Sequence, residues 1–342
     1  MNKMKANIIA LIVICFIVLY ISLKDDFNEV VKQIYSVNIG WFVFACFLMF
    51  MFFIFRALEL HDLVKSVDSK YSFKKALGIV VIGQFFASVT PSSFGAQPAQ
   101  IFFLNKERIR ASHATRIIMQ YSATYQIALL IISFITILLA YQFNIFSNMA
   151  AGFSFKELVV VSFLIHFVVL MFLLGVNFSK KTNTAVIDRI IRVLSFLKIV
   201  RNKEATLVKW NNYLHDFHDG SGTLFKDKRI LIKGILCNIL AVLCMYSIPL
   251  VIMYSLKDYG ALDFMTTTVA SSYTNIISSF MPSPGGTGGF EYFFTQFFGV
   301  FITGVALTTV MLIWRFVTYY FVLFVGSIML LMYKEGAVKE WE

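Results

Sequence analysis

The chain has 342 residues, of which 58% are hydrophobic, 17% are aromatic and only 14% are charged. Soluble domains carry about a quarter charged residues, so this composition excludes an ordinary soluble domain and indicates a membrane protein. The formal net charge of +11 therefore does not indicate nucleic-acid binding. In a membrane protein, an excess of lysine and arginine marks the loops that face the cytoplasm and its anionic lipids.

Hydrophobic segments recur along the whole chain and define the predicted membrane helices. Their approximate bounds are 7–23, 39–55, 76–90, 117–141, 158–178, 230–256, 264–280 and 287–333. No small-residue cleavage site follows the first segment, so we expect a retained span rather than a signal peptide. The last segment exceeds the roughly 20 residues that one crossing needs, which predicts a half-helix over about 287–302 followed by a full span. The short segment 76–90 continues, after a break with Pro and Gly, to about residue 103.

The distribution of basic residues predicts how these segments are arranged. Five lysines and arginines lie within residues 56–75, four within 104–116 and eleven within 179–229, whereas the other connections carry one or two each. All three basic loops face the cytoplasm only if residues 76–103 and 264–302 form re-entrant hairpins, each entering and leaving on one side. One crossing by every segment would instead place two of these basic loops outside.

This arrangement predicts an all-α polytopic membrane protein with an inverted 4+4 repeat, six full spans and two re-entrant hairpins. The first half covers residues 1–141, with its hairpin at about 76–103. The second half covers 142–342, with the cytoplasmic basic loop 179–229 and a hairpin at about 264–302. Both termini are expected in the cytoplasm. Inverted repeats whose broken helices meet near the midplane recur in transporters.

The two predicted hairpin tips resemble each other in sequence. Aligning residues 91–103 with 282–294 gives five identities in thirteen positions, and it places Gln100 opposite Glu291. Phenylalanine is abundant in the chain, so this match gains weight only together with the charge distribution. The identical pairs are Pro91/Pro282, Ser92/Ser283, Gly95/Gly286, Phe102/Phe293 and Phe103/Phe294.

The second tip is the main candidate for a binding site. Glycines let the backbone bend sharply and leave amide groups uncovered, and a half-helix beginning near Thr287 would offer donors to an anion such as a phosphate. Close packing of the two hairpin arms is the alternative role for such small residues. The candidate residues are Pro282, Pro284, Gly285, Gly286, Gly288 and Gly289.

Two ionisable residues, Glu291 and Arg315, lie inside the apolar segments near this tip. Such groups at membrane depth cost roughly 2.5–3.5 kcal/mol on insertion scales and usually face a partner or water. The two could form a structural ion pair. Alternatively, Arg315 could hold a lipid phosphate while Glu291 engages a cationic group or a proton. The corresponding candidates in the first hairpin are Gln97, Gln100, Pro91 and Gly95.

Other polar residues in or near the predicted spans receive structural interpretations. Arg56 and Glu59 are expected at a solvated helix end, and His166 is expected to be a hydrogen-bonded core residue. The hydroxyl-rich stretch 271–279 suits either a polar cavity wall or helix–helix hydrogen bonding. Residues 187–194 predict an amphipathic helix on the anionic inner leaflet, with a solvated linker as the alternative.

No metal site, cofactor fingerprint or catalytic arrangement is predicted. The cysteines lie inside apolar segments without ligand spacing and are expected to be packing residues. They are Cys15, Cys46, Cys237 and Cys244. No nucleophile accompanied by a base is recognisable, so we expect neither enzymatic activity nor a cofactor.

Three motifs together resemble a known family. Residues 90–104 (TPSSFGAQPAQIFFL), 119–126 (MQYSATYQ) and 282–291 (PSPGGTGGFE) are similar to the lysylphosphatidylglycerol synthase/flippase membrane-domain family, and the resemblance covers nearly the whole chain. It implies a bacterial or archaeal inner-membrane protein that moves lipids between leaflets. The chain ends at Glu342, soon after the last span, so we expect no synthase activity. Ala96 stands where this branch often carries a second glycine.

We therefore expect a flippase-like lipid translocase in the cell (inner) membrane. A polar groove formed by the two hairpins would carry the headgroup of a phospholipid, aminoacyl-phospholipid or glycolipid between leaflets. One alternative is a non-transporting scaffold that docks a glycosyltransferase or lipid-synthesis enzyme through the basic loop 179–229. A small-solute transporter is another. Membrane lipid is the expected partner, a homo-oligomer is compatible with the sequence, and nucleic acid is not expected.

Overall fold

The structure is a computed structural model that describes residues 27–146, 155–178, 189, 210 and 227–339. The first predicted span and most of the basic loop, with its predicted amphipathic helix, lie outside the described residues. The regular elements of the described chain are helices, apart from one isolated β-bridge. In chain order they are α2 (Phe27–Tyr35), α3 (Ile39–Lys65), α4 (Phe73–Val89), α5 (Ala96–Lys106), α6 (Ala111–Gln142), α7 (Phe155–Phe178), α11 (Lys228–Tyr246), α12 (Ile248–Ser255), α13 (Phe264–Ser278), α14 (Gly289–Phe298), α15 (Gly304–Arg315), the π-helical turn η1 (Phe316–Tyr320) and α16 (Phe321–Lys339).

Five helical stretches are long and apolar enough to cross a membrane, which confirms five of the six predicted spans. They are Ile39–Lys65, Ala111–Gln142, Glu157–Val176, Lys228–Ser255 and Gly304–Tyr333. Two of these stretches are interrupted. α12 follows α11 with Pro249 in its first turn, and α15 passes into α16 through η1. Both interruptions lie within stretches that the sequence predicts as continuous spans.

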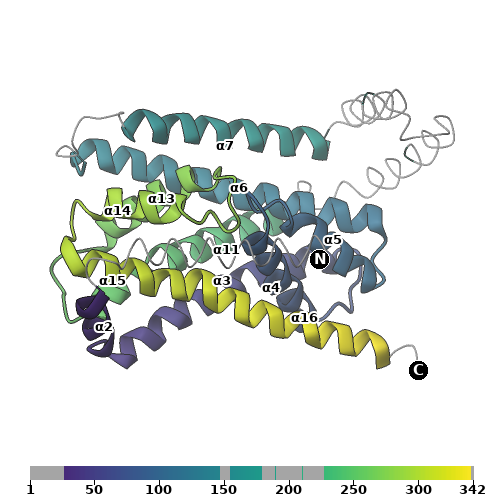
Figure 1. Ribbon diagram of the computed structural model, residues 1–342. Coiled ribbons are helices and arrows are strands. Elements are labelled where there is room, and N and C mark those ends of the chain that lie inside the picture. The colour runs from purple at the N-terminus through teal and green to yellow at the C-terminus, as the bar shows by residue number, and fades with distance from the viewer. Residues whose placement is uncertain (1–26, 147–154, 179–188, 190–209, 211–226, 340–342) are drawn as a thin grey trace.

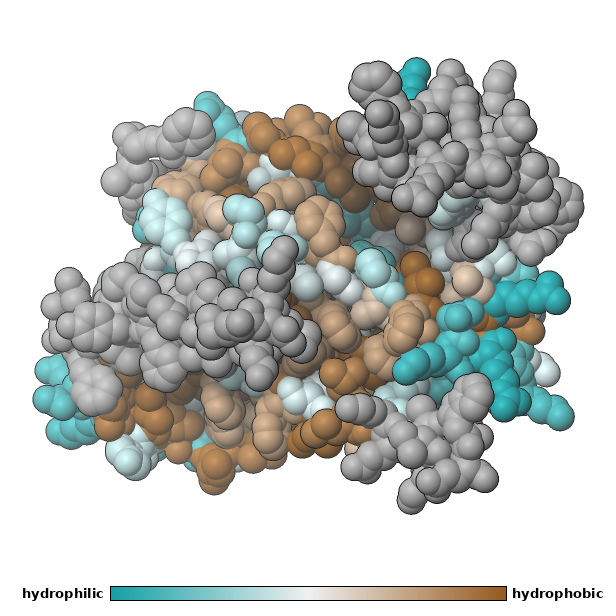
Figure 2. All heavy atoms as spheres, turned by 45° about the vertical axis from the view of Figure 1, so that its right-hand side comes forward, coloured by the Kyte–Doolittle hydropathy of each residue, from teal (hydrophilic) through white to brown (hydrophobic). Residues whose placement is uncertain are grey.

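The outward surfaces of these helices are apolar. On α7, for example, Leu164, Val168 and Phe172 are exposed. In Figure 2, apolar residues extend across the middle of the visible face, and hydrophilic residues gather at its right-hand end. Hydrocarbon is as apolar as these side chains, so their exposure to lipid carries none of the penalty that water would impose.

Four of the short helices form two pairs, and none of these four is long enough to cross alone. α4 and α5 have 17 and 11 residues, whereas α13 and α14 have 15 and 10; one crossing needs roughly 20. α5 packs against α4, and α14 packs against α13. In Figure 1 the first pair lies toward the end of the molecule where α6 begins, and the second pair lies toward the opposite end, beside α15.

Polar caps determine where several helices begin. Asn38 accepts hydrogen bonds from two backbone amides at the start of α3, and Asp227 accepts one at the start of α11. Asp263 and Thr266 form a capping box at the start of α13. Such side chains satisfy amide groups that have no partner within the helix. Each cap lies in a connection between apolar segments.

Buried aromatic side chains hold α14 inside the protein. Phe294, Phe297 and Phe298 are fully buried, and Phe294 stacks on Trp314 of α15 with ring centroids 4.9 Å apart. Helices in a membrane associate through close packing rather than through exclusion of water. This packing directs the N-terminal end of α14, with its glycine-rich turn, toward the centre of the molecule.

Candidate functional site

The two breaks that contain Pro and Gly meet each other inside the molecule. Pro91, after α4, and Pro284, after α13, form an antiparallel β-bridge. Ser92 Oγ donates a hydrogen bond to the carbonyl oxygen of Met281 (3.3 Å), across 189 positions of sequence. The tips of the two helix pairs are therefore in direct contact.

Both sides of this tip junction (residues 90–95 and 281–288) have the same backbone turn. The two residues that follow each bridging proline have positive φ angles. They are Ser92 (48°), Ser93 (58°), Gly285 (58°) and Gly286 (64°). A glycine then caps each short helix, Gly95 before α5 and Gly288 before α14. Two different sequences thus share this turn up to the cap, where Gly95 has a φ angle of −76° and Gly288 one of 88°.

This turn corrects the predicted register between the two tips by two residues. Pro91 corresponds to Pro284 and not to Pro282, because the bridge and the positive φ angles follow Pro284. The predicted alignment is wrong because it relies on identical residues, whereas the turn depends on backbone conformation. In the corrected register, Gln100 no longer corresponds to Glu291, so this predicted pairing is also wrong.

Ser92 and Ser93 hold a left-handed backbone that glycine adopts more readily. For a residue with a Cβ atom this conformation costs roughly 1–2 kcal/mol. The surrounding turn maintains it: the amide of Gly95 donates to Thr90 Oγ1 (2.9 Å), and the amide of Phe94 donates to the carbonyl of the bridging proline (3.2 Å). Strained backbone of this kind tends to cluster at functional sites.

At the second tip, several glycines have no room for a side chain, among them Gly285 and Gly289. A Cβ atom at Gly285 would lie 2.1 Å from the ring of Tyr319, and one at Gly289 would lie 2.3 Å from Met281 Cγ. Tyr319 also donates a hydrogen bond through its hydroxyl to the carbonyl oxygen of Ser88 in α4 (3.4 Å). Both tips and the last span are therefore packed together at this point.

Glu291 and Arg315 form an ion pair beside the second tip. Arg315 Nε donates to Glu291 Oε1 at 2.5 Å, and the amide of Gly288 donates to Glu291 Oε2 at 2.7 Å. Arg315 Nη2 also lies 3.4 Å from the Gly285 carbonyl oxygen and from Thr287 Oγ1. The Arg315 side chain is only 7% exposed and the Glu291 side chain only 13%. The pair thus fastens α14 and its turn to the last span.

Aromatic rings enclose the Arg315 guanidinium. Its carbon lies 4.8 Å from the ring centroid of Tyr319, 5.4 Å from that of Phe290 and 5.9 Å from that of Trp314. Such cation–π contacts stabilise a positive charge away from water. Arg315 is also the last residue of α15, and the π-helical turn η1 follows it directly. π-Helical turns are frequent at functional sites.

The glutamines of the first tip do not join this pair. Gln100 is buried, and it lies so close to α4 that a Cβ atom at Gly83 would come within 2.5 Å of its Nε2. Gln97 is half-buried. Among the described residues, no hydrogen bond links either glutamine to Glu291 or Arg315. Gln100 thus packs α5 onto α4.

A second buried polar cluster lies between α3, α6 and α11, where the prediction of a solvated helix end is wrong. Glu59 is only 2% exposed. It accepts hydrogen bonds from Thr124 Oγ1, Asn238 Nδ2 (2.8 Å) and Arg56 Nη1 (3.3 Å). The Arg56 guanidinium also lies over the Tyr121 ring, 3.8 Å from its centroid. The first two partners are 65 and 179 positions away, so the sequence near Glu59 carries no signal for them.

The prediction that His166 is a hydrogen-bonded core residue is confirmed. Its Nδ1 lies 2.6 Å from Gln126 Nε2, which can donate to it, and its Nε2 lies 2.9 Å from Ser279 Oγ. The hydroxyls of α13 also serve helix contacts: Thr136 Oγ1 donates to Ser272 Oγ at 2.9 Å. Of the two alternatives for this stretch, helix–helix hydrogen bonding is the one that the structure shows.

The long apolar helices, and the broken helices between them, define an all-helical, multi-pass membrane protein. Residues 7–326 match the family described as lysylphosphatidylglycerol synthase TM region, and the chain belongs to this family. A relative from Archaeoglobus fulgidus, described as a UPF0104 membrane protein, is 26% identical over 303 residues, which cover 84% of each chain. The predicted family is thereby confirmed.

Proposed function

We propose that the protein is a lipid translocase in which a polar headgroup moves from one leaflet to the other by passing between the two sides of the tip junction. The contact between Pro91 and Pro284 carries this proposal. Irregular backbone at membrane depth is tolerated where it is buried in protein or lines a watery cavity. Here two such segments converge from separate helix pairs, as they do at the substrate sites of many transporters. Membership of a family named for lysylphosphatidylglycerol, a lipid, supports the choice of substrate class.

The same contacts support a re-entrant interpretation of the short helices. At the base of the first pair, Lys75 near the start of α4 bonds to Glu107 just after α5, so both ends of the pair lie together. The second pair lies toward the opposite end of the molecule (Figure 1). In the proposal, α4–α5 and α13–α14 are re-entrant hairpins of two inverted halves. The basic loops and both termini then face the cytoplasm of the inner membrane.

The residues of the tip junction take different roles in this proposal. The short helices α5 and α14 begin at the junction, and their N-terminal ends favour a phosphate group. Ser93 is exposed and Gln97 is half-buried, so both are available to a passing headgroup. Arg315 and Glu291 are occupied by each other and by the second turn. They position this turn and would contact the headgroup only after rearrangement.

The proposed substrate is a phospholipid, an aminoacyl-phospholipid or a glycolipid, whose acyl chains stay in the bilayer during transfer. No covalent step is included, so the chain acts as a transporter rather than as an enzyme. A glycosyltransferase or lipid-synthesis enzyme that supplies or consumes the lipid is the proposed protein partner.

A reconstitution experiment tests the proposal. The full chain is placed in liposomes with a trace of fluorescent phosphatidylglycerol, and a membrane-impermeant quencher reports how much of it reaches the outer leaflet. Gly285→Ala should slow transfer strongly, because the new Cβ atom meets Tyr319 in a packed site, which costs about 1–3 kcal/mol besides the backbone strain. Gly304→Ala is the matched control: φ is also positive (62°), but nothing lies within 4 Å of its Cβ position.

Equal transfer by the two alanine variants would remove the tip junction from the transport path. The assay is repeated with a fluorescent aminoacyl-phospholipid and with a fluorescent glycolipid. If the natural chain moves none of the three lipids faster than protein-free liposomes do, the proposed translocation is wrong. Neutralising the basic residues within 179–229 and measuring enzyme recruitment would then test the scaffold alternative.

A further inference from the structure

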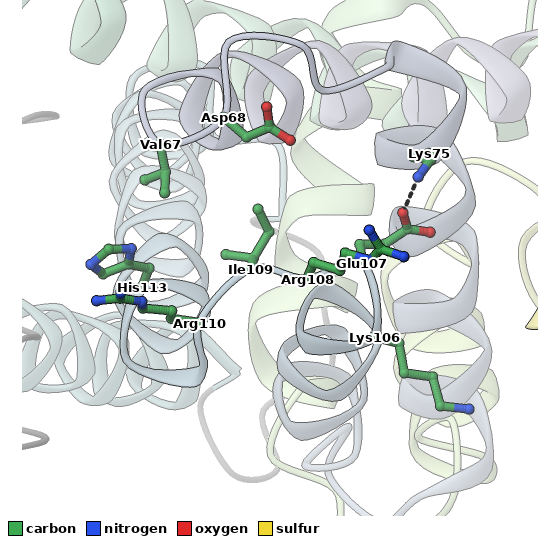
Figure 3. Close-up of a pocket in the computed structure, with 9 residues that line it drawn as sticks. All are labelled: Val67, Asp68, Lys75, Lys106, Glu107, Arg108, Ile109, Arg110 and His113. Carbon is green, nitrogen blue, oxygen red and sulfur yellow. Dashed lines mark hydrogen bonds and ion pairs between the residues drawn. The ribbon is translucent and has the colours of Figure 1, made fainter. Parts of the chain in front are cut away.

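A cavity of about 570 Å³ opens at the far end of the first helix pair, away from the tip junction. Its walls come from the α3–α4 connection, the start of α4 and the α5–α6 connection, as Figure 3 shows. Basic side chains dominate these walls. The charged and titratable residues that line the cavity include Lys75, Arg108, Arg110, His113, Asp68 and Glu107.

The charges of this cavity are only partly compensated. Glu107 already accepts hydrogen bonds from Lys75 Nζ and from the Tyr333 hydroxyl, one on each carboxylate oxygen. Among the residues that the structure describes, the guanidinium groups of Arg108 and Arg110 have neither a hydrogen bond nor an ion pair. Both side chains are exposed. A positive charge is therefore available to an incoming anion.

Lys106 does not belong to this group, although it borders the cavity. Its ammonium lies over the Phe102 ring, 5.0 Å from the centroid, and Figure 3 shows it directed away from Arg110 and His113. The Lys106 ammonium thus lies at the same end of the molecule as Arg108 and Arg110 but is directed away from Arg110.

The backbone at Arg108 is unusual for an arginine. Its φ angle is 66°, a left-handed conformation that glycine commonly supplies after a helix. The turn is held by the Ile109 amide, which donates to the Leu104 carbonyl (3.2 Å), and by Asn105 Nδ2, which donates to the Ile109 carbonyl (3.0 Å). A cation thus stands at the rim of the cavity where glycine would relieve strain, which favours a role for the side chain itself.

A further uncompensated cation belongs to α6, whose first turn lines the cavity through His113. Arg116 follows His113 by one helical turn on α6, and it is only 3% exposed. Within the described part of the chain, its Nε and Nη1 atoms are buried and have no hydrogen-bond partner. A buried guanidinium without a counter-charge raises the electrostatic attraction for an anion nearby, because the local dielectric constant is low.

We propose that this cavity binds a phosphate group, with Arg108 and Arg110 as its ligands and Arg116 as a nearby buried charge. Arginine suits this ligand because its planar fork matches phosphate oxygens. The phosphate belongs either to an anionic lipid headgroup of the adjacent leaflet or to a soluble phosphate ester. The site is separate from the tip junction and does not rest on the proposed transport function.

Binding to the purified full chain tests the site. Native mass spectrometry counts retained dioleoyl-phosphatidylglycerol against dioleoyl-phosphatidylcholine, and inorganic phosphate and glycerol phosphate are tested separately by thermal shift. Arg108→Gly should reduce phosphatidylglycerol retention about tenfold, because a charge-assisted hydrogen bond is lost. Its melting temperature should stay equal or rise, because glycine relieves the positive φ angle, so misfolding cannot explain the loss.

Two matched controls remove one cation each. Lys257→Gly also replaces a basic residue at positive φ (64°), but outside the cavity. Lys74→Ala removes an exposed charge at the start of α4, at the same end of the molecule but outside the cavity lining. Both should retain phosphatidylglycerol as the natural chain does. A loss specific to Arg108→Gly supports the site, and the probe that shows it identifies the lipid or the soluble ester as the source. Equal binding by Arg108→Gly, or an equal loss in Lys74→Ala, overturns it.

Discussion

At the scale of single residues, Arg315 and Glu291 hold opposite charges where little water reaches them. Removal of one partner leaves the other charge uncompensated, which costs about 3–5 kcal/mol in a buried pair. We expect Glu291→Gln and Arg315→Gln each to lower the melting temperature of the detergent-solubilised protein markedly. The double variant should recover part of the loss, because neither charge then remains alone.

An exposed pair gives the control for this prediction. Lys233 Nζ lies 2.6 Å from Asp62 Oδ2, and the lysine side chain is 57% exposed. Asp62→Asn should therefore cost only about 0–1 kcal/mol. If Glu291→Gln is as mild as Asp62→Asn, or if the two losses simply add in the double variant, Glu291 and Arg315 do not act as a buried pair. Direct headgroup contact would then explain these residues better.

The residue scale also shows where sequence reasoning stops. Glu291 and Arg315 could be recognised because each is a rare charge inside an apolar segment. Glu59 has the same chemistry, but it lies within the predicted loop 56–75. Its burial depends on Thr124 and Asn238, which reach it from other helices. The sequence therefore identifies unusual charges and cannot identify the distant partners that bury them.

At the scale of elements, the short helices and the meeting of their tips were predictable, whereas the register of that contact was not. Segment length together with proline and glycine indicates where a membrane helix breaks. The tips share a turn because Ser92 and Ser93 adopt the same left-handed backbone as Gly285 and Gly286. Serine gives no signal for that conformation. An alignment by residue type therefore finds the two tips but places them two residues out of register.

The contact between the tips can be tested with a disulfide. Residues paired in an antiparallel bridge have Cα atoms about 4.5–5.5 Å apart, within the range that a disulfide spans. In a chain whose four natural cysteines are replaced, Pro91→Cys with Pro284→Cys should therefore cross-link under mild oxidation. We expect the cross-link to stop lipid transfer, because a headgroup can no longer pass between the tips. Electrophoresis after limited proteolysis and the liposome assay measure the two effects.

The single variants, oxidised in the same way, serve as controls, and a reducing agent should restore transfer. Failure of the double variant to cross-link would contradict the contact itself. An efficient cross-link that leaves transfer unchanged would show that the tips stay together during transport, and the headgroup path would then have to lie beside the junction rather than between its two sides.

At the scale of the whole molecule, hydropathy was informative because the bilayer imposes one length and one composition on every span. Five spans were therefore recovered, although the helix predicted over 39–55 continues to Lys65 and the one predicted over 117–141 already begins at Ala111. Hydropathy alone does not tell which apolar segments cross the membrane, because α4 with α5 could form either one broken crossing or one hairpin. The distribution of lysine and arginine between the segments distinguishes these two arrangements. Basic residues near their ends, such as Lys75 and Arg108, favour the hairpin.

Single cysteines placed at both ends of each pair decide between these topologies. Lys70 and Ala111 flank α4–α5, Asp258 and Thr303 flank α13–α14, and all four are exposed. In the cysteine-free chain, we expect an impermeant maleimide to label Lys70→Cys and Ala111→Cys from the cytoplasmic side only. Asp258→Cys and Thr303→Cys should be labelled from the outside only, because each hairpin returns to the side it left. Labelling of Lys70→Cys and Ala111→Cys from opposite sides would mean that α4 and α5 together make one crossing. The two halves would then no longer be inverted, and the tip junction would join a broken span to a hairpin instead of two hairpins.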